Sequence, residues 1–306
     1  FGKKTFSKFT IDPNNLLKTR TLGLSPRNTT LEVQYRSGGG LTHNVSARSI
    51  SSVSGLVMVF EKSPSAADAQ AVRASISVTN DAEASGGEDP LTIEEVRGLI
   101  SAARNAQNRI VSKQDLLSRI YTMPATFGRV FRAGISPNQR NPLATNMYIV
   151  NRNISGKLTL SPDSLKKNIV TYLNEFRLIS DAIDILDARI VNVGIEFKIS
   201  VDPNFSPDAV LRSCISKLIN YMNVENFQIG EPIRSSDLTN LVYNTPGVLA
   251  VVDLRVVNKT GSEGTRIYSH VIHNVRENTS KGLVFPPEGG IFEVKFPSLD
   301  IKGAIV

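Results

Sequence analysis

The chain has one cysteine and no tryptophan in 306 residues, and it lacks a long hydrophobic run. A single cysteine, Cys214, excludes an internal disulfide and a zinc site built from cysteines, and it fits a reducing compartment. Its place between Leu211 and Leu218 on an apolar helical stripe predicts a small buried residue, not a nucleophile. No apolar run approaches the about 20 residues that a membrane-spanning helix needs, so we expect no membrane partner.

Histidine is also scarce, which leaves few groups for acid-base or nucleophilic chemistry. His270 and His273 lie three apart in a predicted strand, which points them to opposite faces, and His43 stands alone in a polar loop. The sequence has no Ser/His/Asp pattern, HExxH motif, Walker loop or GxGxxG motif. We therefore expect no enzyme, and a carboxylate-based enzyme such as a glycosidase is the alternative that stays open.

Only one group of carboxylates suggests a metal site. It consists of Asp181, Asp184 and Asp187, just ahead of the clearest predicted strand. Their spacing of three, with apolar residues between them, does not follow the calcium-loop pattern. We expect these aspartates to be solvated turn residues, and we expect neither a metal nor another cofactor.

The net charge of +7 and the isoelectric point near 9.5 would suit an acidic partner. The basic residues are scattered, however, and the densest groups are the pairs Lys3 with Lys4 and Lys166 with Lys167. Diffuse charge favours a solvated surface, or complementarity to an acidic neighbour, over a nucleic-acid groove. A nucleic-acid-binding module that uses the basic surface remains the second functional hypothesis.

Residues 83–135 carry the strongest local signals. Thr92 with Glu95 fits a capping box, and apolar residues three or four apart then predict an amphipathic helix. Ser112 with Asp115 predicts the start of a second helix, which Pro124 ends. Residues 127–135 are rich in β-branched and aromatic side chains and predict a strand.

Four short motifs follow one another in the same segment. They are S-G-G-x-D at 85–89, E-E-x-R at 94–97, R-I-V-S-x-x-D-L at 109–116 and P-x-x-F-G-x-V at 124–130. Their order resembles the baseplate J-like family of contractile-tailed phages, and within it the large wedge proteins of T-even-type baseplates. Further short motifs extend the resemblance over residues 31–257.

The resemblance implies a structural protein of the virion, without catalytic residues. Members belong to the tail baseplate and are assembled in the host cytoplasm. Copies contact one another, as a dimer and in a higher ring, and contact other baseplate wedge proteins during assembly and sheath-contraction triggering. Because the chain begins at Phe1 without a methionine, we expect it to be a C-terminal fragment of a larger wedge protein.

The element pattern predicts a multidomain α+β protein. Residues 1–82 are expected to form a β-rich domain with an N-terminal arm, with strands at 31–36, 56–61 and 72–80. Residues 83–189 form a helical and mixed α/β, sandwich-like central domain, with a strand at 146–152. Residues 190–257 form a strand-helix-helix-strand domain, and residues 258–306 form a β-rich C-terminal tail.

The third predicted domain has the most regular pattern. Residues 191–201 alternate strictly and predict a strand, and residues 236–243 and 248–257 predict a helix and a strand. Two helices are expected to start alike, at Ser161-Pro162-Asp163 and at Ser206-Pro207-Asp208, with the serine as N-cap. The helix after Ser206 and the one at 236–243 should cover one face of the sheet.

The tail is predicted to have short strands at 266–275, 283–285 and 291–296 and no helix. A sheet with an uncovered apolar face needs a partner, either the rest of the chain or another copy. We therefore predict an interface, with a twofold dimer as its simplest form. The candidate interface residues are Ile267, Val271, Ile291, Phe292 and Val294.

Overall fold

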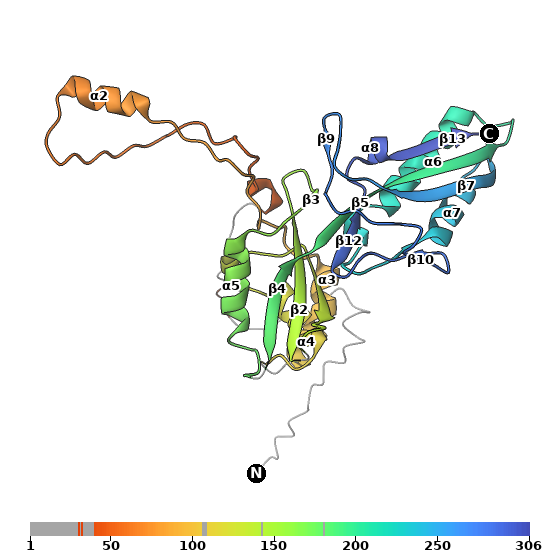
Figure 1. The fold of residues 1–306 in the computed structure, drawn as a ribbon, viewed down its shortest axis with the longest axis horizontal. Coiled ribbons are helices and arrows are strands. Elements are labelled where there is room, and N and C mark those ends of the chain that lie inside the picture. The colour runs from red at the N-terminus through yellow and green to blue at the C-terminus, as the bar shows by residue number, and fades with distance from the viewer. Residues whose placement is uncertain (1–29, 31, 33–39, 106–108, 142, 180) are drawn as a thin grey trace, which may run out of the picture.

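The computed structural model describes residues 30, 32, 40–105, 109–141, 143–179 and 181–306. It shows a long arm, a first sheet with helices on one face, and a second sheet with helices on one face (Figure 1). The predicted α+β, multidomain class is confirmed. The predicted strand at 31–36 and the pair Lys3 with Lys4 lie outside the described residues.

The arm, residues 45–84, projects far from both sheets (Figure 1). It contains helix α2 (Ala66–Ser75), whose N-cap Ser65 accepts a hydrogen bond of 3.1 Å from the Asp68 amide. The strands predicted at 56–61 and 72–80 are wrong, since no strand occurs in the described part of 40–131. The alanines at 66, 67, 69, 71 and 74 favour helix over strand, and the other limb of the arm does not pair with residues 56–60.

The arm is fastened at its base, next to the 3-10 helix η1 (Leu41–His43). The Arg48 amide donates to the Asn80 carbonyl at 2.7 Å, and the Ala84 amide donates to the Val45 carbonyl at 2.8 Å. Asn44 is buried, and its Nδ2 donates to the Arg152 carbonyl at 2.9 Å. The first two bonds join the limbs of the arm to each other, and the Asn44 bond ties the base of the arm to the first sheet.

The first sheet is built on β2 (Ala144–Arg152). β1 (Arg132–Pro137) and β3 (Leu158–Thr159) pair with it antiparallel, and β4 (Ala182–Asp187) pairs with it parallel. Helices α4 (Lys113–Tyr121) and α5 (Asp163–Leu173) cover one face, and α3 (Ile93–Asn105) packs on α4. Met147 and Ile149 of β2 are fully buried under these helices.

Two predictions for this region need correction. The strand predicted at 127–135 begins only at Arg132, because the 3-10 helix η2 (Ala125–Phe127) and Gly128, at φ +95°, turn the chain first. The aspartates predicted in a turn instead belong largely to β4, which contains Asp184 and Asp187. The apolar residues between them alternate along β4 and fit a strand paired on one edge.

The second sheet is built on β5 (Arg189–Val201), with β7 (Val248–Asn258) antiparallel on one side. The other side of β5 carries β12 (Gly290–Glu293) and β13 (Ile301–Ile305), both parallel to it. Helices α6 (Pro207–Tyr221) and α7 (Ser235–Tyr243) pack on one face over a core that includes Val193, Ile195 and Leu218. The predicted elements at 191–201, 236–243 and 248–257 are confirmed.

The tail returns into the second sheet. The single strand predicted at 266–275 is wrong: only β9 (Arg266–Ile267) forms, as a short hairpin with β8 (Ser262–Glu263). β10 (Thr279–Ser280) and β11 (Leu283–Val284) make a small sheet with β6 (Ile233–Arg234). The tail was predicted to have no helix, which is wrong, since the short helix α8 (Pro297–Asp300) precedes β13. The Tyr268 hydroxyl donates to the buried Asp300 carboxylate of α8 at 2.6 Å.

The two sheets are joined by the chain and by a shared apolar contact. β4 leads through Ala188 directly into β5. A buried cluster from both sides fills the space between them: Phe131, Tyr148, Val150, Leu158, Ala188 and Ile291. A shared core of this kind fixes one sheet against the other.

The two Ser-Pro-Asp segments begin helices in different ways from the prediction. Ser161 is not the N-cap of α5; Pro162 holds that position, and the buried Ser161 hydroxyl donates to Asn151 Oδ1 at 3.0 Å. Ser206 is the N-cap of α6, but its side chain makes no capping hydrogen bond. The capping boxes at Thr92 with Glu95 and at Ser112 with Asp115 are both present.

Candidate protein-protein interface

The five tail residues predicted as an interface do not lie on one free surface. Ile291, Phe292 and Val294 are buried in the chain's own core, and Val271 packs against the same core. Only Ile267, in β9, is largely exposed, at 66% of its surface. The tail therefore finds its apolar partner in the body of the chain, which was one of the two options that the sequence left open.

The scarce reactive side chains are placed for packing. Cys214 is fully buried in α6, and burial raises the pKa of its thiol, so the reactive thiolate is disfavoured. His273 is buried against the ring of Phe292, and burial lowers its pKa. His270 and His43 are exposed.

Neither a metal cluster nor a membrane helix occurs in the part of the chain that the structure describes. Those residues include no group of three or more His, Cys, Asp or Glu side chains that could hold a metal ion. No helix in the described ranges is both long and apolar enough to cross a bilayer.

Strand β4 presents an open edge. Among the described strands it pairs only with β2, over six consecutive residue pairs without a bulge. The amides of Ala182 and Ala188 donate to β2-side carbonyls of Leu143 and Ile149 at 3.1 and 2.9 Å. Because alternate residues of a strand direct their backbone groups to opposite edges, Ile183 and Ile185 direct theirs away from β2. This edge is a template for one more strand.

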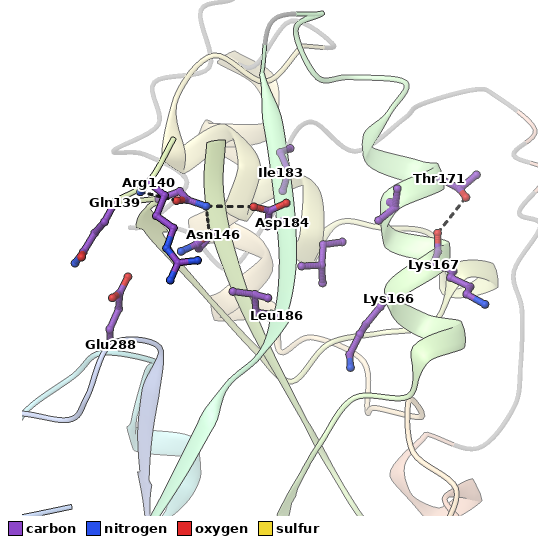
Figure 2. A pocket seen from close by; sticks show the side chains of 13 residues that line it. Gln139, Arg140, Asn146, Lys166, Lys167, Thr171, Ile183, Asp184, Leu186 and Glu288 are labelled. Carbon is purple, nitrogen blue, oxygen red and sulfur yellow. Dashed lines mark hydrogen bonds between the residues drawn. The ribbon is translucent and has the colours of Figure 1, made fainter. Parts of the chain in front are cut away.

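A groove of about 880 Å³ follows this edge, lined by α5 on one side of β4 and by the loop after β1 and Glu288 on the other (Figure 2). We call it the β4 groove. Its lining residues are Asn138, Gln139, Arg140, Asn146, Lys166, Lys167, Val170, Thr171, Ile183, Asp184, Ile185, Leu186 and Glu288. A second hollow of about 320 Å³ continues it and shares Val170, Ile183 and Ile185. Val170, Ile183 and Ile185 thus form an apolar part of the groove next to α5, beside Lys166, Lys167 and Thr171 of the same helix, and Val170 is 43% exposed there.

Most charges of the β4 groove are already satisfied by the chain itself. Lys166 Nζ lies 2.6 Å from Asp187 Oδ2 and 3.2 Å from Asp163 Oδ1. Burial alone would lower the pKa of Lys166, but the bonds to the two aspartates outweigh it and the pKa is raised. Half of the Lys166-Lys167 pair is therefore neutralised, which weakens the nucleic-acid hypothesis at this place.

The carboxylates of the groove also have partners. Asn138 Nδ2 donates to Asp184 Oδ2 at 3.3 Å (Figure 2). Ser136 Oγ donates to Glu288 Oε1 at 2.7 Å. The side chains that satisfy them come from the loop after β1 and from the end of β1 itself. An occupant of the groove consequently does not need to pair with Lys166, Asp184 or Glu288, while Arg140 and Lys167 are exposed.

Other strands also end a row of pairing, among them β1, β7 and β13. β1 pairs with β2 over six residue pairs, but it contains Gly134 and ends at Pro137, which has no amide hydrogen. β7 has register shifts opposite Lys198 and Ser200, which are β-bulges that bend an edge. β13 is five residues long and contains Lys302 and Gly303. Bulges, lysine and proline are among the devices by which proteins block edge pairing, and β4 has none of these three, although it carries Asp184 and Asp187.

The arm is the second exposed feature. Eight large apolar side chains are exposed on it: Ile50, Val53, Val57, Val59, Phe60, Val72, Ile76 and Val78. Helix α2 at its tip has no buried residue. So many exposed apolar groups on one projecting segment indicate a surface for a partner. Sequence reasoning missed both the projecting arm and the β4 edge, although residues 56–60 form an apolar run and Ile183 and Ile185 alternate with polar or exposed positions.

No family model matches the chain, and no curated protein matches it. Among solved structures, the chain is similar to one in the "Cryo-EM structure of the anti-feeding prophage (AFP) baseplate, 6-fold symmetrised". The TM-score is 0.42 and the sequence identity is 12%, over 60% of this chain and 41% of that chain. The chain thus spans about two-fifths of the length of that structure's chain.

Proposed function

We propose that this chain is a structural component of a contractile phage tail baseplate, a wedge subunit that acts through protein-protein contacts and not as an enzyme. Its partners are further copies of itself and other wedge proteins, and its location is the virion tail. The order of the four motifs at 85–130 supports the choice of family. The arm and the β4 edge support the mode of action.

One observation carries the proposal: the arm has no core of its own. Its residues are held in place at the base by Asn80 and Asn44, while its eight large apolar side chains face solvent. Ordering a backbone costs about 1–2 kcal/mol per residue, and exposed apolar side chains do not offset that cost. The arm therefore needs the surface of a neighbour to be ordered, as a subunit within an assembly would provide.

Removal of the arm tests this role. The two limbs meet where the Arg48 amide contacts the Asn80 carbonyl at 2.7 Å, so a short glycine linker can join residues 48 and 80 without moving the body. We expect the shortened protein to keep the melting temperature of the body and to be lost from purified contractile tails, whereas the intact protein co-purifies with them. Absence of the intact protein from tails, or equal incorporation of the shortened one, would contradict the proposal.

The nucleic-acid alternative makes an opposite prediction. Several basic side chains are already paired within the chain, among them Arg152, Lys166 and Arg255. We expect little retention on immobilised DNA at physiological salt. Strong retention that falls steeply as salt rises would favour the nucleic-acid module instead.

A further inference from the structure

One segment of the arm has the form of an unpaired β-strand. Residues 56–60, with the sequence LVMVF, are apolar, uncharged and not part of any helix or strand. Val57 and Val59 are each 92% exposed, while Leu56 faces Ile76 and Val78 across a hollow of the arm. A strand that has not joined a sheet has the side chains of every second residue on the same side. Its backbone amides and carbonyls have no hydrogen-bond partners on a neighbouring strand.

The β4 edge offers the complementary half. Ile183 and Ile185 are also two apart, lie on the α5 side of the sheet, and have backbone groups directed away from β2. Val170 of α5 stands above the same edge. A strand laid along β4 would place alternate side chains in the apolar part of the β4 groove, under α5.

We propose that residues 56–60 of one copy of this chain add as a strand to the free edge of β4 in a second copy. Val57 and Val59 then pack beside Ile183 and Ile185 under α5, and the four-stranded first sheet gains a fifth strand. The inference rests on the proposed function, because it names the contact by which copies of an assembly subunit hold each other. Reciprocal exchange of arms between two copies closes a twofold dimer.

The charges of the β4 groove fit this occupant. Lys166, Asp184 and Glu288 have partners within their own chain, and the two other charged lining residues, Arg140 and Lys167, are exposed, so their charges can stay in contact with water when an uncharged segment binds. The residues that follow the segment, Glu61 and Lys62, are charged and end it. Strand addition supplies main-chain hydrogen bonds for affinity and side-chain pockets for specificity.

The occupant comes from another copy because of where the arm goes. Its base lies at Val45 and Ala84, and from there the arm projects away from the first sheet (Figure 1). The segment therefore does not reach the β4 edge of its own chain in this structure. A second copy brings the same segment without bending the arm back on itself.

Complementation between two variants tests the contact. Val57→Asp with Val59→Asp removes the donor strand, and Val170→Arg, at an exposed helix position, fills the acceptor groove. Light scattering after size exclusion should show a wild-type mass of two copies at tens of micromolar, and each variant alone should show one copy. An equimolar mixture should regain a two-copy species, because one intact donor then meets one intact acceptor. Variants with the wild-type mass, or a mixture that stays at one copy, would overturn the inference.

Cross-linking separates the second copy from the chain's own arm. The only native cysteine, Cys214, is fully buried, so Val59→Cys and Val170→Cys add single accessible thiols. A short bis-maleimide should join a Val59→Cys protein to a Val170→Cys protein in a mixture and should join neither to itself. If the double variant at high dilution is linked within one chain, the arm binds its own groove and the inference fails.

The outcomes also distinguish this inference from the proposed function. A wild-type oligomer that the donor and acceptor substitutions leave unchanged refutes strand addition, while the structural role stands. The same conclusion follows if the wild-type protein is monomeric in solution at tens of micromolar but is present in purified tails: strand addition is then refuted and the structural role stands. A one-copy protein that is also absent from tails contradicts both.

Discussion

Arg152 Nη1 lies 3.0 Å from Glu225 Oε1, so the last residue of β2 is tied to the 3-10 helix η3 (Val224–Asn226), which follows α6. The same guanidinium forms an ion pair with Glu88, ahead of α3, and packs 4.2 Å from the centroid of the Phe131 ring. Burial alone would lower the pKa of Arg152, but the bonds to both glutamates raise it. One side chain thus joins the first sheet, the segment that follows α6 and the segment below the arm.

Loss of this side chain should be costly. Arg152→Ala leaves the Glu88 carboxylate, which is only 10% exposed, without its partner. We expect the free energy of unfolding to fall by about 3 kcal/mol, as for other broken buried pairs. The control is Arg255→Ala, which removes an ion pair to Glu196 on the surface and should cost less than about 1 kcal/mol. Equal losses in urea denaturation would show that Arg152 does not join the parts.

Two serines at helix starts should differ, although the sequence makes them look alike. Ser112 accepts a hydrogen bond of 3.1 Å from the Asp115 amide, and Ser206 makes no capping bond. We therefore expect Ser112→Ala to lower stability by about 1 kcal/mol and Ser206→Ala to change it by less than about 0.5 kcal/mol. Urea midpoints at an unchanged slope measure both. An equal loss at the two sites would mean that cap geometry does not decide the cost.

The sequence predicted best those elements that have their own local periodicity. The helices at Ile93, Lys113, Pro207 and Ser235 and the strand β5 show amphipathic or alternating patterns, and each forms close to where the pattern places it. The Thr92-Glu95 and Ser112-Asp115 boxes are formed by residues three apart, so the information is local.

Elements whose state depends on distant partners were not predictable in this way. β4 is a strand because β2 pairs with it across more than thirty residues of chain, and its aspartates read as turn residues without that partner. Residues 56–60 have strand composition but find no ladder within the chain. The tail residues Ile291 and Phe292 were expected at an interface, because the sequence does not show that β12 inserts beside β5. For the same reason, the candidate site at β4 and the arm was not predictable from the sequence.

Chelation provides a test of the expected independence from metals. Histidines and the single cysteine are separated, and the described residues hold no cluster of three ligands. We expect thermal unfolding curves with and without a chelator to coincide. A decrease of several degrees in the melting temperature after chelation would reveal a metal site that contributes to the fold.

Glu293 should make the stability depend on pH. Its carboxylate is 1% exposed, and burial raises its pKa, although bonds from the Leu158 amide and Asn192 Nδ2, both 2.7 Å, act in the opposite direction. With a raised folded pKa, the native state holds the proton longer than the unfolded state. The stabilising contribution is therefore full below the usual pKa of 4.5 and is lost as pH rises through the folded pKa.

The measurement compares wild type with Glu293→Gln, which does not titrate. The unfolding free energy of the wild-type protein should fall relative to that of Glu293→Gln as pH rises above 4.5. A repeat at high salt serves as control, because salt screens surface charge much more than a buried group. A difference that is constant across pH would refute the assignment.

The contact between the two sheets depends on a glycine that precedes β12. Gly289 has φ +66°, and a Cβ on it would overlap the ring of Tyr148, which is buried in the apolar cluster between the sheets. Gly156 has a similar φ of +73°, but open space surrounds it. Comparison of alanine substitutions at the two glycines therefore separates the free-energy cost of the backbone conformation from that of the clash with Tyr148. We expect Gly156→Ala to cost about 1 kcal/mol and Gly289→Ala about 3 kcal/mol, because only the second also overpacks the core. Denaturation of both variants measures this difference, and similar losses would mean that Tyr148 has room to move and that the sheets are not fixed by this contact.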